Sequence, residues 1–198
     1  MQIRFTYYKP ELLVTIIGLL WPVLSWVLSK LWGYGFLQGF GPGVIVMGLL
    51  TLYDKYLWKL PVLNLLNNVP NLNGIYEGEI AYHYNEQDST KSCRLEITQT
   101  CSNIKVKSIF NKDGENDTQS VSEEAFIKTD DVGDQHLYFY YHNQGSYKSG
   151  DTLDSHDGMN VLEILKEKET VKLKGYYFTN RNPQTKGCME VTKTTKRR

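Results

Sequence analysis

Hydrophobic residues follow two different patterns along the 198-residue chain. Two apolar runs lie within the first sixty residues, whereas from Asn71 onward short runs rich in Tyr, Val, Ile and Phe alternate with polar turn residues. A long apolar run is typical of a membrane-spanning helix, and short runs bounded by turn residues are typical of β-strands. The pattern therefore predicts a helical N-terminal part followed by an all-β domain.

The first apolar run, residues 12–28, contains no charged residue and is near the minimum length for crossing a bilayer core of about 30 Å. Pro22 lies inside the run and is tolerated in membrane helices. A cleaved signal peptide is the alternative, because Arg4 and Lys9 precede the run, but no small-residue cleavage site follows it. We therefore predict a transmembrane helix over 12–28.

The second apolar run, residues 43–53, is too short to cross alone, because it forms only about 16 Å of helix. We expect the span to extend back through the preceding glycines and to cover 34–53, where the charged pair that follows ends it. Gly35, Gly39 and Gly43 would then share one helix face, an arrangement that lets membrane helices approach closely. A turn between the two spans is the alternative interpretation of these glycines.

Charged and aromatic residues near the spans suggest an orientation. Arg4, Lys9, Lys55 and Lys59 flank the outer ends of the hairpin, whereas only Lys30 lies in the short connection. The positive-inside rule then places both termini in the cytoplasm. Aromatic residues gather near the predicted span ends, as interface anchors do: Tyr7, Tyr8, Trp32, Tyr34, Tyr53 and Trp58.

The chain therefore divides into a two-helix transmembrane hairpin over 1–58, a connector over 59–70 and an all-β domain over 71–198. Eight strands are expected, separated by clusters of Asn, Asp, Gly and Pro. Their predicted ranges are 74–84, 92–100, 103–110, 119–128, 135–142, 158–166, 170–180 and 186–193. About eight short consecutive strands favour an antiparallel up-and-down barrel, which can enclose one small ligand. A two-sheet sandwich is the alternative.

Alternation along each strand assigns one set of side chains to the barrel interior. In the first and seventh strands the inward set includes Tyr76, Tyr82, Tyr84, Tyr177 and Thr179. Buried tyrosine hydroxyls need hydrogen-bond partners, which a polar ligand or trapped water would supply. The alternative is that these tyrosines fill a solid barrel and bond to the backbone.

Charge and cysteine content narrow the possible functions. Residues 1–70 carry five basic and two acidic side chains, and the remainder carries 17 basic and 20 acidic ones. A mildly acidic domain is poorly suited to gripping long nucleic acid, which requires many phosphate contacts. Cys93, Cys101 and Cys188 have neither metal-ligand spacing nor the pattern of a disulfide framework, so we interpret them as reduced structural thiols.

No motif for catalysis, metal binding or cofactor binding stands out. The segment "DSHDG" at 154–158 holds Ser155, His156 and Asp157 side by side. A catalytic triad is assembled in space, however, and neighbouring residues on a turn rarely face one another. There is no P-loop, dinucleotide-binding glycine motif or nucleophile elbow. We expect a protein that is not an enzyme and holds neither a metal nor a cofactor.

Three features together resemble a known family: the span pair, the opening "NLNGIYEGEI" at 71–80, and the closing "LKGYYFTNRNPQTKGCMEV" at 173–191. This combination is similar to the two-transmembrane, β-strand-rich effectors of CBASS. CBASS systems are bacterial anti-phage systems in which a CD-NTase enzyme makes a cyclic oligonucleotide after infection. The resemblance covers the whole chain.

The resemblance implies that the barrel binds a cyclic dinucleotide from a CD-NTase, that the protein then forms a homo-oligomer, and that its spans disrupt the inner membrane lipids and kill the infected cell. It implies a multi-pass protein of the bacterial inner membrane with both termini cytoplasmic. A cyclic dinucleotide offers bases for stacking and phosphates for charge-assisted hydrogen bonds. From the predicted strand faces, the candidate contacts are Tyr76, Tyr82, Tyr84, Tyr177, Thr179 and Arg181.

Under this hypothesis, Gly35, Gly39 and Gly43 would let spans from several subunits pack once ligand favours the assembled state. Two other classes of protein remain open. One is a membrane-tethered carrier of lipocalin or avidin type, and the other is a structural assembly protein with no nucleotide ligand.

Overall fold

A computed structural model describes most of the chain, in six segments: residues 5–30, 41–84, 87–112, 115–143, 155–167 and 170–194. The chain forms two compact units. The first comprises residues 1–71 together with 100–103, and the second comprises residues 72–99 and 104–198.

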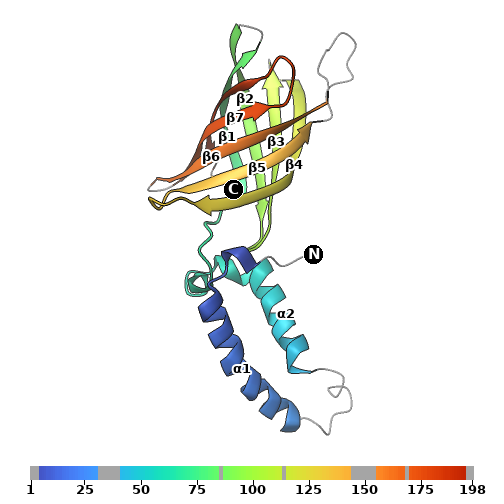
Figure 1. Ribbon diagram of the computed structural model, residues 1–198, viewed down its shortest axis with the longest axis vertical. Coiled ribbons are helices and arrows are strands. Elements are labelled where there is room, and N and C mark those ends of the chain that lie inside the picture. Colours follow the sequence, from blue (N-terminus) through green and yellow to red (C-terminus); the bar gives the residue numbers. More distant parts are fainter. Residues whose placement is uncertain are drawn as a thin grey trace. The chain divides into compact units, whose positions relative to one another are not determined.

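The first unit is helical (Figure 1). Its longest helix, α1 (Pro10–Lys30), has 21 residues, most of them apolar, and of these only Leu13 is buried. By length and composition α1 is sufficient to cross a membrane. Large apolar side chains along it, among them Val14, Leu19 and Trp26, are more than 60% exposed. This exposure fits a helix whose surroundings are not water.

The second helix, α2 (Pro42–Lys55), begins at Pro42 and not at residue 34 as the sequence suggested. Gly41 caps it in an extended conformation (φ −71°, ψ 161°), and Pro42 takes the first helical turn, where its missing N–H costs nothing. Fourteen residues form only about 21 Å of helix, which is shorter than a bilayer core. A second membrane crossing therefore stays a prediction.

The predicted glycine face is not part of one continuous helix, because α2 starts after Gly41. Gly35 and Gly39 lie outside the described residues. Gly43 is described, and a Cβ atom added there would lie 3.8 Å from the Trp21 ring on α1. Gly43 therefore faces the other helix of its own chain, which makes it a packing residue within the hairpin.

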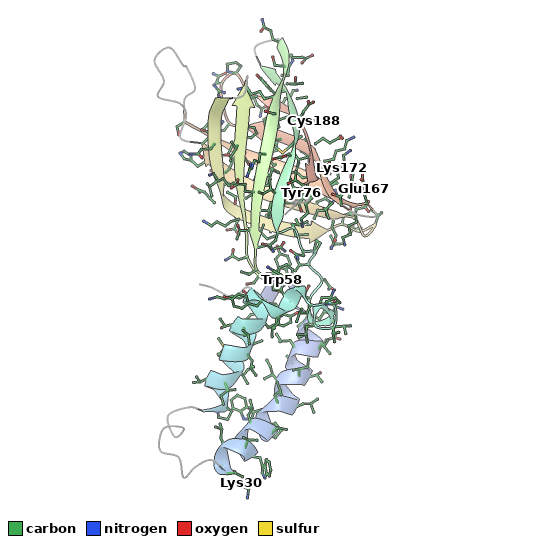
Figure 2. The ribbon with its side chains drawn as sticks, turned by 180° about the vertical axis from the view of Figure 1, so that it is seen from behind. Lys30, Trp58, Tyr76, Glu167, Lys172 and Cys188 are labelled. Carbon is green, nitrogen blue, oxygen red and sulfur yellow. The ribbon has the colours of Figure 1, made fainter. Side chains whose placement is uncertain are left out.

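The first unit has a small core of its own, and three of the residues predicted to be aromatic interface anchors lie in it. Tyr8, Tyr53 and Trp58 are buried, with exposed fractions of 4%, 6% and 1% (Trp58 is labelled in Figure 2). The Tyr53 hydroxyl donates to the Leu63 carbonyl at 2.9 Å and accepts from the Asn67 amide at 2.8 Å. These three aromatic side chains therefore pack inside the unit. The prediction that they face lipid headgroups is wrong for them.

Three short 3-10 helices among the described residues also belong to the first unit, one before α1 and two at the start of or within the predicted connector. They are η1 (Phe5–Tyr7), η3 (Leu57–Lys59) and η4 (Asn64–Leu66). An isolated bridge pairs Tyr8 with Asn67, so the connector packs against the start of the chain.

The second unit is a closed barrel of eight antiparallel strands in sequence order, with β8 pairing back onto β1 (Figure 1). The strands are β1 (Gly74–Tyr84), β2 (Gln87–Gln99), β3 (Ile104–Lys112), β4 (Glu115–Thr129), β5 (Gln135–Asn143), β6 (His156–Lys166), β7 (Val171–Thr179) and β8 (Lys186–Lys193). The predicted fold class, an apolar helical N-terminal part followed by an eight-stranded barrel, is confirmed, and the sandwich is excluded.

Several strands extend further into the hairpins than the sequence suggested. β2 starts at Gln87, paired with Tyr84, and β4 starts at Glu115, paired with Lys112. Polar residues there favour turns in isolation. In the barrel, the cross-strand hydrogen bonds of a continuing ladder outweigh that local preference.

The barrel core follows the predicted alternation. Leu173 lies on the same face of β7 as Tyr177, which was expected to point inward, and it is completely buried, as are Leu95 on β2 and Val106 on β3. Other buried apolar side chains of the strands complete the interior: Ile80, Ile97, Ile104, Ala125, Ile127, Leu137, Phe139, Leu162, Ile164, Met189 and Val191. This packing fills the barrel over much of its length and leaves open space at one end.

Candidate functional site

A cavity of about 110 Å³ lies at one end of the barrel, among the C-terminal ends of β1, β3, β5 and β7 and the start of β6. We call it the mouth cavity. Its lining includes Tyr82, Tyr141, Asn160, Tyr177 and Arg181. Because these residues come from strands far apart in the sequence, only closure of the barrel brings them together.

Two buried tyrosines form the aromatic part of the mouth cavity. Tyr141 and Tyr177 are 6% and 7% exposed. Burial raises the pKa of Tyr141 to about 12 and raises the pKa of Tyr177 well above its usual value, while the positive charge of Arg181 opposes both shifts. Both phenols are therefore neutral at physiological pH, and each hydroxyl can donate and accept a hydrogen bond.

The Tyr141 ring has its position because of a glycine on the neighbouring strand. Gly158 pairs directly with Tyr141, and a Cβ atom at Gly158 would collide with the Tyr141 phenol ring. The His156 ring meets the Tyr141 ring edge-on, with centroids 6.5 Å apart. A larger residue at position 158 would therefore have to displace the Tyr141 ring.

The charge of the mouth cavity is positive. Lys91 and Arg181 are in its lining, and none of the lining residues that the structure describes is acidic. The Lys91 ammonium lies 5.8 Å from the centre of the Tyr82 ring, within range of a cation–π interaction. Aromatic rings beside cations suit a ligand that carries both planar groups and negative charge.

Buried polar side chains complete the cavity. The Thr179 hydroxyl donates to the Thr185 carbonyl at 3.3 Å and accepts from the Thr185 backbone N–H at 3.2 Å. Asn160 and Thr185 are 2% and 8% exposed, yet Asn160 Oδ1 and Thr185 Oγ1 find no hydrogen-bond partner among the described residues. Buried polar atoms of this kind call for a ligand or a water molecule.

Four of the predicted ligand contacts lie in the mouth cavity: Tyr82, Tyr177, Thr179 and Arg181. Their contact with a ligand stays a prediction. Tyr84 ends β1 and pairs with Gln87, but its side chain is outside what the structure describes.

Tyr76 also lies on β1 (labelled in Figure 2), but it is not in the lining of the mouth cavity. It precedes Tyr82 by six residues, which is about 20 Å along a strand. Its side chain is completely buried, and its hydroxyl donates to the Leu72 carbonyl at 3.0 Å. For Tyr76 the alternative interpretation therefore holds, because it fills the core and bonds to the backbone.

Sequence reasoning missed Tyr141, Asn160, His156 and Lys91. Alternation within the predicted strands could have found two of them, because Tyr141 lies on the same face as Leu137 and Asn160 lies on the same face as Leu162. Lys91 was missed for a different reason, because β2 begins five residues before the predicted range and Lys91 lay outside it.

The "DSHDG" segment forms a network with a histidine from another strand. Ser155 Oγ lies 3.2 Å from His142 Nε2, and His142 Nδ1 lies 2.8 Å from Asp157 Oδ1. The partner is thus His142 on β5, while His156 is in the lining of the mouth cavity. Ser155, His142 and Asp157 do not belong to that lining, so we interpret the network as structural.

This network anchors the loop that carries Arg181. The Asp157 N–H donates to Asn180 Oδ1 at 2.8 Å, the Asn180 N–H donates to the Asp157 carbonyl at 3.0 Å, and Asn180 Nδ2 lies 3.3 Å from Asp157 Oδ2. The hydrogen bond from His142 lowers the pKa of Asp157, so its carboxylate stays ionised. Asn180 immediately precedes Arg181, and the bonds to Asp157 fix where the loop leaves β7.

Comparisons with known proteins identify the family. Residues 67–193 match the family model described as "Cap15, cyclic dinucleotide receptor domain". The chain is also 30% identical over 152 residues to CD-NTase-associated protein 15 of Yersinia aleksiciae, covering 76% of this chain and 68% of that protein. The match includes all eight strands and every described residue named above in the mouth cavity. The resemblance to CBASS effectors is thereby confirmed, and this chain belongs to the Cap15 cyclic dinucleotide receptor domain family.

Proposed function

We propose that this CBASS effector binds a cyclic dinucleotide in the mouth cavity of its barrel. One observation carries the proposal: the region that matches a cyclic dinucleotide receptor domain contains a cavity that combines buried tyrosines, two cations and unsatisfied polar atoms. The chain acts as a binding effector, and the ligand is its activating signal. No catalytic step is assigned to it.

The chemistry of the cavity matches the two parts of such a ligand. Tyr82, Tyr141 and Tyr177 supply aromatic surface for stacking bases, a contribution of about 1–3 kcal/mol per base. Arg181 and Lys91 supply donors and positive charge for phosphate oxygens, where charge-assisted hydrogen bonds are about twice as strong as neutral ones.

Replacing Arg181 by alanine is expected to weaken binding of the activating cyclic dinucleotide by about tenfold or more, because a charge-assisted phosphate contact is lost. The measurement is isothermal titration calorimetry of the full chain in lipid nanodiscs against a panel of cyclic dinucleotides, with linear dinucleotides as controls. Arg181→Lys keeps the charge and should lose less affinity.

Arg94 provides a matched control for this experiment. It lies on the outer face of β2, where its guanidinium is 2.8 Å from Glu96 and 3.8 Å from Glu77. Arg94→Ala removes the same charge away from the cavity and should leave affinity unchanged. Equal losses in both variants, or no heat with any cyclic dinucleotide, would contradict the site. Binding of a fatty acid without any nucleotide response would favour the carrier.

We further infer that ligand binding leads to oligomerisation and disruption of the inner membrane by the N-terminal helices. Support comes from α1, which is long and apolar enough to span a bilayer and exposes most of its side chains. Ligand drives such a change only if it binds the assembled state more tightly than the resting state.

The barrel is proposed to lie in the cytoplasm, where a bacterial CD-NTase would release its product. Basic residues outside the hairpin exceed those in its connection, which supports the same orientation. A fluorescent reporter fused after Arg198 should therefore be active in the cytoplasm, and alkaline phosphatase at the same position should be inactive. The reverse pattern would place the barrel outside and exclude a cytoplasmic messenger.

A further inference from the structure

Asn160 occupies a special position in the mouth cavity. It lies between Phe139 on β5 and Tyr177 on β7, its direct cross-strand partners, and is 2% exposed. Its Oδ1 atom has no hydrogen-bond partner among the described residues. A buried acceptor without a donor is destabilising, so a group that brings a donor to this point will be bound preferentially.

The kind of donor decides which part of a nucleotide fits. A phosphodiester is an anion with acceptor oxygens only, so it has no donor to offer the unpartnered Asn160 carbonyl oxygen. The exocyclic amines of adenine, cytosine and guanine carry N–H donors on the edge of a planar ring. Thr185 Oγ1, the second unsatisfied buried atom in the cavity, accepts or donates and can therefore serve the same edge.

The cations lie nearer to the exit from the barrel than Asn160 does. Arg181 follows the end of β7, four residues beyond Tyr177, the partner of Asn160. Lys91 belongs to the part of β2 that precedes Cys93, where side chains are exposed or half-buried. Positive charge therefore lies at the entrance, and a neutral acceptor lies behind it.

Cavity size points to the same arrangement. About 110 Å³ is well below the 300–1,000 Å³ that encloses a whole drug-sized ligand. It offers room for one planar ring system beside Tyr141 and Tyr177, with the remainder of a cyclic dinucleotide outside. A ligand that entered with a phosphate first would place its charge among two neutral phenols and an amide, away from Arg181.

We propose that one base of the ligand enters the mouth cavity and donates its exocyclic amine to Asn160 Oδ1, while the phosphates stay at the entrance with Arg181 and Lys91. This inference rests on the proposed function and adds an orientation and a selectivity to it. Asn160 becomes a specificity-determining residue that favours a base carrying an exocyclic amine over the same base without that amine.

The test uses two matched pairs of probes with the full chain in nanodiscs: cyclic di-AMP and its analogue with purine in place of adenine, and cyclic di-GMP and its analogue with hypoxanthine in place of guanine. The two members of each pair differ only by the exocyclic amine. At least one amine-bearing probe should bind about tenfold more tightly than its amine-free partner. Asn160→Ala should remove this preference by weakening the amine-bearing probe. Asn160→Asp keeps an acceptor oxygen and should keep the preference.

A probe with one neutral phosphate analogue distinguishes contacts to the base from contacts to the phosphate. Replacing one phosphodiester of the amine-bearing probe by a neutral methylphosphonate should weaken binding to wild type and to Asn160→Ala by the same factor, but should have little effect in Arg181→Ala. If the methylphosphonate weakened binding to wild type but not to Asn160→Ala, the proposed orientation would be wrong. It would also be wrong if the probes bound with no preference for the amine. If none of the probes binds, the proposed function fails as well, so the two failures are distinguishable.

Discussion

Under the proposed function, replacing Gly43 by leucine is expected to abolish ligand-triggered cell death while leaving cyclic dinucleotide affinity unchanged. The Cβ position of residue 43 is already in van der Waals contact with the Trp21 ring, so the rest of a leucine side chain would force α1 and α2 apart. Overpacking of this kind costs about 1–3 kcal/mol. Survival of cells that express the protein with its CD-NTase would measure the effect, with calorimetry as the binding readout.

Gly48 is the matched control, because a Cβ atom there meets nothing within 4 Å. Gly48→Leu makes the same change on the same helix and should preserve killing. A Trp21→Ala replacement in the Gly43→Leu background returns space to the contact and should restore part of the activity. Loss of killing with Gly48→Leu but not with Gly43→Leu would show that the outer face of α2 matters, and not the packing inside the hairpin.

The barrel could be predicted because the features that define its strands and turns are local in the sequence. Turn residues separate the strands, and period-two alternation identifies the face that packs inside, as Leu95, Val106 and Leu173 show. The start of α2 was harder to predict, because residue 34 was chosen only so that the span would be long enough to cross a membrane. Local backbone chemistry placed it at Pro42, after an extended glycine.

The candidate site was predictable in part, since alternation gives the face of a residue but not its depth. Tyr76 and Tyr82 share one face of β1, yet only Tyr82 is in the lining of the mouth cavity. Strand ends near a predicted turn were the better guide, because Thr179 and Arg181 both lie there. Contacts between neighbouring strands, such as His142 on β5 with Asp157 on β6, depend on the register of the two strands, which spacing in the sequence does not give.

Asp54 shows a different limit of sequence reasoning. A charged pair after an apolar run indicates the end of a membrane span, and Asp54 with Lys55 fits that pattern. In the structure the Asp54 side chain is completely buried. Its Oδ1 accepts a hydrogen bond from the Tyr8 hydroxyl at 3.2 Å and from the Ser102 N–H at 2.9 Å, and its carbonyl accepts from the Cys101 N–H at 2.9 Å.

Replacing Asp54 by alanine is therefore expected to separate ligand binding from cell death. Residues 100–103 join β2 to β3 in the chain but belong to the first unit, and Asp54 holds two of them. Alanine leaves the buried Ser102 N–H and the Tyr8 hydroxyl without their acceptor, at a cost of about 1–3 kcal/mol for each. Affinity for the ligand should stay within about twofold of wild type, because the mouth cavity contains none of these residues.

Asp54→Asn is the control, because its amide oxygen can still accept both hydrogen bonds and should preserve much of the activity. Cell survival, calorimetry and thermal unfolding of the full chain in nanodiscs would be measured for both variants. Wild-type killing by Asp54→Ala would show that this turn plays no part in signalling. Loss of binding together with loss of killing would instead mean that Asp54 supports the barrel itself, since a residue needed only for the signal leaves the receptor intact.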